Sequence, residues 1–186
     1  MRKKIPSTFI NMCAVLTGIS LSASFLLGLA YTKTQDAIER VKNEKIITAV
    51  REVLPEFDND PLAEKYTNAA WPLFEFYPAK KNGQPAGTAV RSYSPDGFSG
   101  NIWIIAGFLP DGTIFNVKLT EHGETPGLGS KSGEMPFIGQ FINKHPGHFI
   151  LKVKKDGGSV DAVTAATISS RAFCDALSRA YSALNK

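Results

Sequence analysis

The sequence predicts an α+β protein in which a transmembrane helix and a stalk helix precede a head with a largely antiparallel sheet flanked by helices. Three observations predict this class. An apolar run without charged residues occupies residues 5–32. β-Branched and aromatic segments recur between residues 71 and 119, separated by Asn, Asp, Gly and Pro. Apolar residues then return at spacings of three and four from residue 168 to the C-terminal end, which is the period of a helix.

The first domain, residues 1–32, is expected to hold a cytoplasmic N-terminus and one transmembrane helix. The uncharged run at 5–32 exceeds the ~20 residues that span a hydrocarbon core. Basic residues at 2–4 favour a cytoplasmic N-terminus, which places the rest of the chain on the outer side of the inner (cytoplasmic) membrane. A cleaved signal peptide is the alternative, because small residues at 28–30 offer a cleavage position. We favour the uncleaved single-pass anchor because the run is longer than the apolar part of a signal peptide.

The second domain, residues 33–70, is expected to connect the membrane to the head. Residues 33–54 carry an apolar stripe at helical spacing and predict an amphipathic stalk helix, which Pro55 ends. The acidic and polar segment 56–68 is expected to be a flexible linker.

The third domain, residues 71–186, is expected to be the head. Strands are predicted at residues 73–77, 88–93, 102–109 and 113–119, with turn signals at 81–83, 94–97 and 110–112. The third and fourth strands should form a hairpin, and the apolar run of the third is typical of a central strand. A short helix at 135–142, a last strand at 149–153, a turn at 156–158 and the closing helix follow.

Charge and cysteine content argue against a nucleic-acid-binding surface and against an internal disulfide. The net charge is +4, and three of the positive charges lie at residues 2–4, so no nucleic-acid-binding surface is expected. Cys13 lies in the apolar run and Cys174 on the last helix, so a disulfide between them is not expected.

The start of the closing helix carries several hydroxyl side chains. Thr164, Thr167 and Ser169 lie at or just before its N-terminus, where unpaired N–H groups and a partial positive charge can hold a phosphate. The small residues Ala165 and Ala166 would let a ligand approach the backbone. The alternative is that Thr164 or Thr167 is an ordinary N-cap residue.

A second informative stretch, residues 121–131, follows the fourth strand. It combines acids, an imidazole, hydroxyls and three glycines in a loop, where backbone amides can contact a flat ligand. A metal site would use His122 with Glu121 or Glu124, but this falls short of a recognisable ligand set, and no metal is expected.

Four motifs in this order resemble one family. They are GFSGNI at 97–102, DGTI at 111–114, HGETPGLG at 122–129 and TAATIS at 164–169. Together they resemble the FMN-binding domain of the G subunit of Rnf electron-transport complexes, which is related to the C subunit of the sodium-pumping NADH:quinone oxidoreductase. The compact length of the chain is more similar to the Rnf protein.

The resemblance implies a covalent cofactor. In the family, a separate flavin transferase that uses FAD joins FMN through a phosphoester to a threonine that matches Thr167, with Asp161, Thr164 and Ser169 at surrounding motif positions. The usual glycine of the motif is Ala165 here, a departure that matters if this position needs a positive φ.

The same resemblance implies that the loop at 124–129 lines the isoalloxazine. Glu124, Thr125, Gly127 and Leu128 are its candidate cofactor-binding residues. No catalytic residue is expected, because the flavin itself carries the electrons.

The implied function is an extracytoplasmic electron-transfer subunit of an ion-translocating ferredoxin:NAD oxidoreductase, with the other Rnf membrane subunits as partners. The alternatives are the C subunit of the sodium pump, a stand-alone flavin-binding module of another redox chain, and a flavin-free structural subunit.

Overall fold

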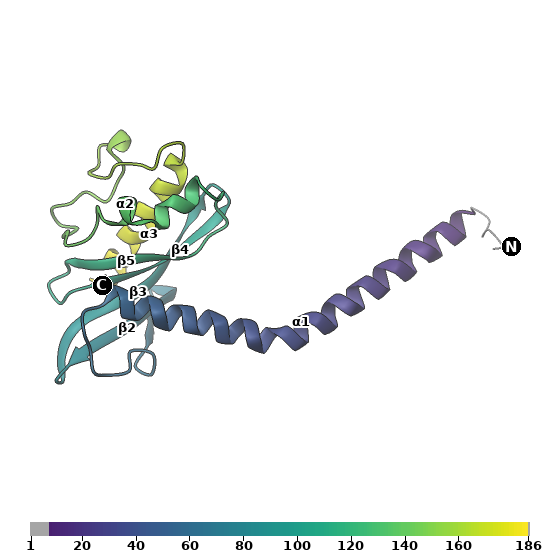
Figure 1. Cartoon of the computed structure of the whole chain (residues 1–186), viewed down its shortest axis with the longest axis horizontal. Helices are drawn as coiled ribbons and strands as arrows, with labels where there is room; N and C mark the ends of the chain where they lie inside the picture. The colour runs from purple at the N-terminus through teal and green to yellow at the C-terminus, as the bar shows by residue number, and fades with distance from the viewer. Residues whose placement is uncertain (1–7, 186) are drawn as a thin grey trace. The chain divides into compact units, whose positions relative to one another are not determined.

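The computed structural model describes residues 8–185 (Figure 1). The chain forms two compact units, one up to Glu44 and one from Lys45 onward. The helix α1 runs without a break over Phe9–Val53. The predicted transmembrane and stalk helices are therefore one continuous helix, and it ends just before Pro55, as expected. The basic residues at 2–4, on which the predicted orientation rests, lie outside the described residues.

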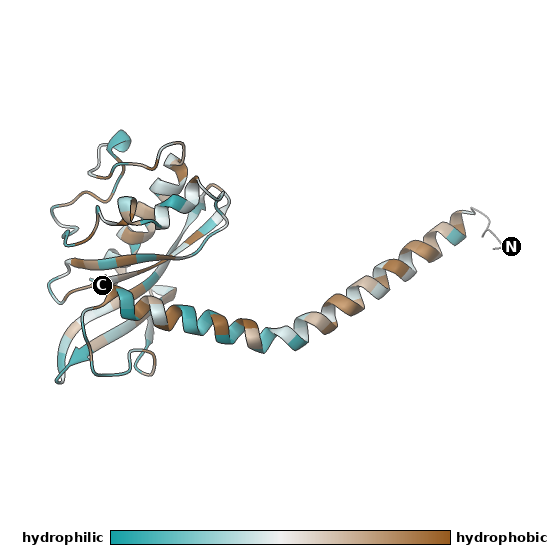
Figure 2. Ribbon diagram, in the orientation of Figure 1, coloured by the Kyte–Doolittle hydropathy of each residue, from teal (hydrophilic) through white to brown (hydrophobic). Residues whose placement is uncertain are grey.

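In the described residues, the first unit consists of α1 up to Glu44. Figure 2 shows hydrophobic residues dominating its N-terminal half, whereas hydrophilic residues alternate with them further along. The helix is long and apolar enough to cross a membrane. Large apolar side chains such as Phe25 and Leu27 are exposed along it, and hydroxyls such as that of Ser22 donate to carbonyls of the preceding turn. Both features suit a helix surrounded by lipid, because its side chains are apolar on the outside and its polar groups are bonded within the helix itself.

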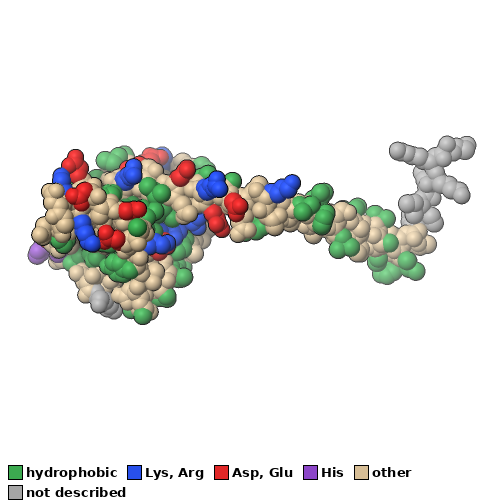
Figure 3. All heavy atoms as spheres, turned by 90° about the horizontal axis from the view of Figure 1, so that it is seen from below, with side chains coloured by type: hydrophobic (Ala, Val, Ile, Leu, Met, Phe, Trp, Pro, Cys, Tyr) green, Lys and Arg blue, Asp and Glu red, His purple; other side chains and the backbone are tan. Residues whose placement is uncertain are grey.

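The second unit contains a five-stranded sheet in the order β1-β2-β3-β4-β5, with every neighbouring pair antiparallel. Its strands are β1 (Tyr66–Asn68), β2 (Trp71–Lys81), β3 (Gln84–Gly97), β4 (Gly100–Phe108) and β5 (Ile114–Glu121). The expected α+β head with an antiparallel sheet is confirmed. On the face shown in Figure 3, acidic and basic side chains are interspersed over the head, so this face carries no patch of one sign.

The two faces of the sheet support two apolar cores. On one face, the end of α1 packs through Val50 and Val53 on Tyr77 and Ile105. This contact is close: a Cβ added at Gly107 in β4 would lie 1.6 Å from the carbonyl oxygen of Val53. The glycine is therefore required where the helix end touches the strand.

On the opposite face lies α3 (Thr167–Leu184), the predicted closing helix. Phe173 of α3 contacts Phe137 and Phe141 with ring centroids 5.3 and 5.4 Å apart. This aromatic trio fixes the segment around α2 (Met135–Ile138), which is shorter than the helix predicted at 135–142 because turns follow it. Cys174 is also buried here, and burial raises the pKa of its thiol to about 12. Both cysteines are free.

Two strands extend past residues that were expected to end them. β2 continues through Pro78, which is tolerated because Asn59, not another strand, bonds this edge through the Pro78 carbonyl and the Lys80 N–H. β3 continues through the expected loop at 94–97, with an irregularity of register that accommodates Pro95. The β3–β4 turn therefore lies at residues 98–99.

Two other expectations differ from the structure. The linker at 56–68 is held in place: Asp58 accepts the Asn82 N–H, and its last three residues form β1. The strand predicted at 149–153 is wrong. Its N–H and C=O groups bond locally to residues 158–160, with an isolated Val153–Val160 bridge, so the apolar residues serve a compact loop that packs under α3. The predicted turn at 156–158 is confirmed, with Gly157 at φ 78° after the 3₁₀ helix η2 (Lys154–Asp156).

Candidate flavin site

A pocket of about 310 Å³ forms where three parts of the second unit meet. The β3–β4 turn, the loop after β5 with the first residue of the 3₁₀ helix η1 (Gly129–Gly133), and the start of α3 each contribute to it. The lining residues are Phe98, Glu124, Thr125, Leu128, Gly129, Ala165, Ala166, Thr167, Ile168 and Ser169. The two stretches that the sequence singled out are thus brought together by the fold.

Glu124 joins the three parts of the pocket. Its side chain is buried, and its Oε1 accepts the backbone N–H of Ser99 at 3.0 Å. Its Oε2 accepts the hydroxyl of Ser169 in the first turn of α3. One carboxylate therefore holds the β3–β4 turn, its own loop and the start of α3 in register.

The N-terminal end of α3 lies at the pocket. Ala166 occupies the N-cap position and Thr167 is the first helical residue, so the alternative that Thr164 or Thr167 caps this helix is wrong. Thr167 is half-buried, and its hydroxyl has no hydrogen-bond partner within residues 8–185. The N–H groups of the first turn lack partners within the helix, as at any helix N-terminus, and favour a negatively charged group there.

The loop that enters α3 is held by Ser170. Its Oγ accepts the Val163 N–H at 2.9 Å and donates to the Ala166 carbonyl at 3.0 Å. Ala165 lies within this loop at φ 60°, in the left-handed region. The alanine that replaces the motif's glycine therefore stands where a glycine has the lower backbone energy, by roughly 1–2 kcal/mol.

Exposed apolar side chains surround the mouth of the pocket. Phe98, Leu128 and Ile168 are exposed by 68%, 44% and 46%, although each lines the pocket. Exposed apolar groups around a concave site are typical of a binding site for a largely apolar ligand. Such a mouth fits the flat ring system of a flavin.

Three predicted site residues lie outside this pocket. Asp161 and Thr164 line a neighbouring pocket together with Lys131, and the Asp161 carboxylate forms an ion pair with Lys154 at 2.7 Å. Gly127, at φ 77°, shapes the loop without lining the pocket. The other seven candidates, Glu124, Thr125, Leu128, Ala165, Ala166, Thr167 and Ser169, all line it.

Phe98 and Ile168 line the pocket although the sequence did not predict them as site residues, and Gly129 was expected there only as part of the loop at 124–129. Phe98 lies inside the first of the four family motifs, so the signal for it was present in the sequence. Ile168 had been assigned to the buried stripe of the closing helix, but its side chain is exposed at the pocket.

Arg171, the basic residue nearest to Thr167 in the sequence, forms an ion pair with Asp156. Arg171 donates two hydrogen bonds to Asp156, at 2.6 and 2.7 Å. These bonds hold the pKa of the Asp156 carboxyl below its usual value and tie η2 to the first turns of α3. Arg171 is therefore held by Asp156, away from a role in binding a phosphate at Thr167.

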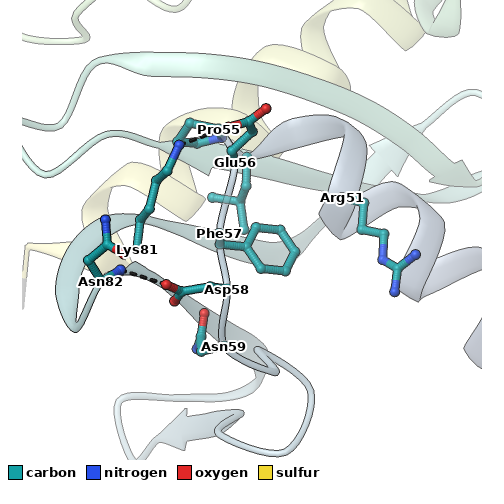
Figure 4. A pocket seen from close by; sticks show the side chains of 9 residues that line it. Arg51, Pro55, Glu56, Phe57, Asp58, Asn59, Lys81 and Asn82 are labelled. Atoms are coloured by element: carbon teal, nitrogen blue, oxygen red, sulfur yellow. Dashed lines mark hydrogen bonds and ion pairs between the residues drawn. The ribbon is translucent and has the colours of Figure 1, made fainter.

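A larger pocket, of about 690 Å³, lies beside the end of α1 (Figure 4). Lys81 reaches across it to Glu56 at 2.8 Å, and the Asn82 N–H donates to Asp58 at 2.7 Å. None of the candidate site residues lines it. We do not assign the cofactor to it.

The chain is similar to several known proteins. A family model described as an FMN-binding domain matches residues 97–182. The chain is 31% identical to the G subunit of the ion-translocating oxidoreductase complex of Vibrio cholerae serotype O1, over 92% of this chain and 88% of that protein. It is 34% identical to the protein of the same name from Photorhabdus laumondii, over 92% and 85%.

Among solved structures, the C subunit of the Na⁺-translocating NADH-quinone reductase from Parabacteroides distasonis superposes with a TM-score of 0.49 at 23% identity, covering 72% of this chain and 76% of that one. From the identity and coverage shared with the two G subunits, the chain belongs to the family of G subunits of ion-translocating oxidoreductase complexes.

Proposed function

We propose that this chain is a membrane-anchored electron-transfer subunit of an ion-translocating oxidoreductase complex, and that it carries FMN joined through its phosphate to Thr167. The observation that carries the proposal is the position of Thr167, which lines the pocket built from three of the four family motifs. The names of its relatives and the FMN-binding family model support the same function.

The residues present fit this cofactor. The open first turn of α3 offers backbone N–H groups to a phosphate on Thr167. Phe98, Leu128 and Ile168 offer apolar surface to the isoalloxazine. When bound, FMN supplies the electron-transfer chemistry, and the chain holds, orients and partly shields it.

A covalent link also suits the proposed location. The head would lie outside the cytoplasm, since the basic residues at 2–4 favour a cytoplasmic N-terminus. A flavin held by contacts alone could be lost there without replacement from the cytoplasmic pool, whereas an ester retains it. Maturation then requires a flavin transferase that uses FAD, in which Thr167 is the acceptor.

The proposed electron path is that of an Rnf complex, between ferredoxin and NAD, with the other membrane subunits as partners. The apolar part of α1, exposed along its length, is the segment that would lie beside them in the bilayer. The chain acts as a redox relay within the complex, so its activity depends on those partners.

The test is attachment of flavin to hydroxyl variants in cells that contain the flavin transferase. We expect Thr167→Val to abolish the flavin-fluorescent band of the full chain on a denaturing gel, because the acceptor oxygen is gone. Ser182→Ala is the comparison, since Ser182 lies near the C-terminal end of α3, outside the motif, where its hydroxyl donates to the Ser178 carbonyl, and its variant should keep the band. A fluorescent Thr167→Val band, or loss of fluorescence in Ser182→Ala, would contradict the assignment.

A further inference from the structure

The wall of the flavin pocket contains an isolated buried carboxylate. Among the described residues that line this pocket, Glu124 is the one with an ionisable acidic or basic side chain. It is only 4% exposed, and its partners, the Ser99 N–H and the Ser169 hydroxyl, carry no charge. Each of its two side-chain oxygens has one of these groups as its hydrogen-bond partner.

Two glycines make room for this carboxylate. A Cβ added at Gly129 would lie 2.4 Å from Glu124 Oε2 and 2.5 Å from Ser169 Oγ. A Cβ added at Gly97 would lie 2.9 Å from Glu124 Oε1. The backbone therefore lies close to both oxygens of Glu124: Gly97 of the β3–β4 hairpin lies beside Oε1, and Gly129 of η1 lies beside Oε2. The backbone thus leaves a recess for the Glu124 side chain beside the pocket.

We propose that the Glu124 carboxylate is a fixed negative charge beside the flavin and lowers its reduction potential. This inference rests on the proposed function. Reduction adds electrons to the ring system, and a nearby buried anion disfavours added negative charge because a poorly solvated site screens charge weakly. The carboxylate is thus a tuning group that the fold supplies from the loop after β5.

The start of α3 moderates this effect. Ser169 belongs to the first turn of α3, whose N–H groups carry a partial positive charge, and no acidic side chain lies in that turn itself. The Glu124 carboxylate bonds this turn from outside the helix, so part of its charge is offset. The expected effect is therefore a moderate shift, not the full interaction of two unscreened charges.

The experiment is a redox titration of the flavin-loaded full chain in detergent, followed by flavin absorbance. Dithionite supplies two electrons, and the buffer supplies the accompanying protons. We expect Glu124→Gln, which removes the charge with little change of shape, to raise the equilibrium constant for reduction at least tenfold. That corresponds to a midpoint about 30 mV more positive for two electrons.

Glu134→Gln is the matched control. Glu134 is exposed and lies between η1 and α2, beside the neighbouring pocket, so solvent screens its charge. We expect its midpoint to equal that of the wild-type chain. An unfolding midpoint for each variant establishes that it is folded.

Three results decide the matter. A Glu124→Gln midpoint equal to or more negative than that of the wild type would overturn the proposal. Glu124→Gln protein without flavin, beside flavin-loaded Glu134→Gln, would also overturn it, because Glu124 would then act in attachment. Absence of flavin from the wild type and Glu134→Gln alike would refute the proposed function itself and this inference with it.

Discussion

At the scale of single residues, Ala165 departs from the glycine that the family motif usually has, and it does so where departure is costly. Its φ of 60° is one of three positive values among the described non-glycine residues. The sequence showed the substitution, but the sign of φ depends on how the loop enters α3, which the hydrogen bond from the Val163 N–H to Ser170 Oγ fixes. The structure was needed to show that the strain is present.

We therefore expect Ala165→Gly to stabilise the head. Relief of the left-handed alanine is worth roughly 1–2 kcal/mol, less about 0.4–1 kcal/mol for the greater freedom of glycine in the unfolded chain. Urea unfolding of the full chain in detergent measures the difference. Ala166→Gly is the control: Ala166 is buried at φ −133°, so its variant should be destabilised. A loss of stability in Ala165→Gly would contradict the strain.

The same scale shows why parts of the site were predictable. Thr167, Glu124 and Leu128 could be chosen because sequence motifs carry them. Gly129 lies in one of these motifs too, but its role of leaving room for the Glu124 carboxyl group and the Ser169 hydroxyl appears only in the fold. Asp161 and Thr164 are near Thr167 in the sequence, yet in the fold they line the neighbouring pocket.

At the scale of elements, α3 connects the apolar core to the cofactor site. Its first turn forms one wall of the pocket, and its buried face packs on β3 and β4. Ser92 of β3 donates to the Ala176 carbonyl at 2.8 Å, which fixes the helix against the strand. The position of Thr167 therefore depends on packing further along the helix.

We expect Phe173→Ala to destabilise the head by about 3–5 kcal/mol, as for other fully buried phenylalanines. Phe173 is fully buried and contacts Phe137 and Phe141, so its loss leaves a cavity between α3 and the segment around α2. Chemical denaturation measures the change. Phe98→Ala is the same substitution at a side chain that is 68% exposed, and it should change stability by no more than about 0.5 kcal/mol.

Equal destabilisation by the two substitutions would contradict this division between core and pocket. Flavin fluorescence gives an independent readout for Phe98→Ala. The Phe98 ring lines the pocket mouth, so its removal should alter the environment of the cofactor.

The elements themselves were predictable where the local pattern decides the structure. The four long strands, the Asn82-Gly83 turn with both φ values positive, and α3 follow from alternation, turn residues and helical spacing. The pattern failed where partners decide. β2 continues through Pro78 because it pairs with β3 on one side and Asn59 bonds its other edge. An irregularity of register lets β3 continue past Pro95. The apolar residues near 150 form no strand, because no neighbouring strand pairs with them in the described residues.

At the scale of the whole molecule, the chain joins an apolar helix suited to lipid to a flavin-binding head. The single helix α1 belongs to both units, with its apolar part in the first and its last turns in the core of the second. In the proposed function the flavin itself carries the electrons. The account therefore depends on one covalent attachment, which gives the head its redox group.

The most direct measurement is the mass of the tryptic peptide that spans residues 156–171 from the chain purified from its native membranes. The account predicts that this peptide carries an FMN-sized increment and that fragment ions place it on Thr167, although Ser159, Thr164, Ser169 and Ser170 lie in the same peptide. An unmodified peptide, or an increment on another of these hydroxyls, would contradict the account.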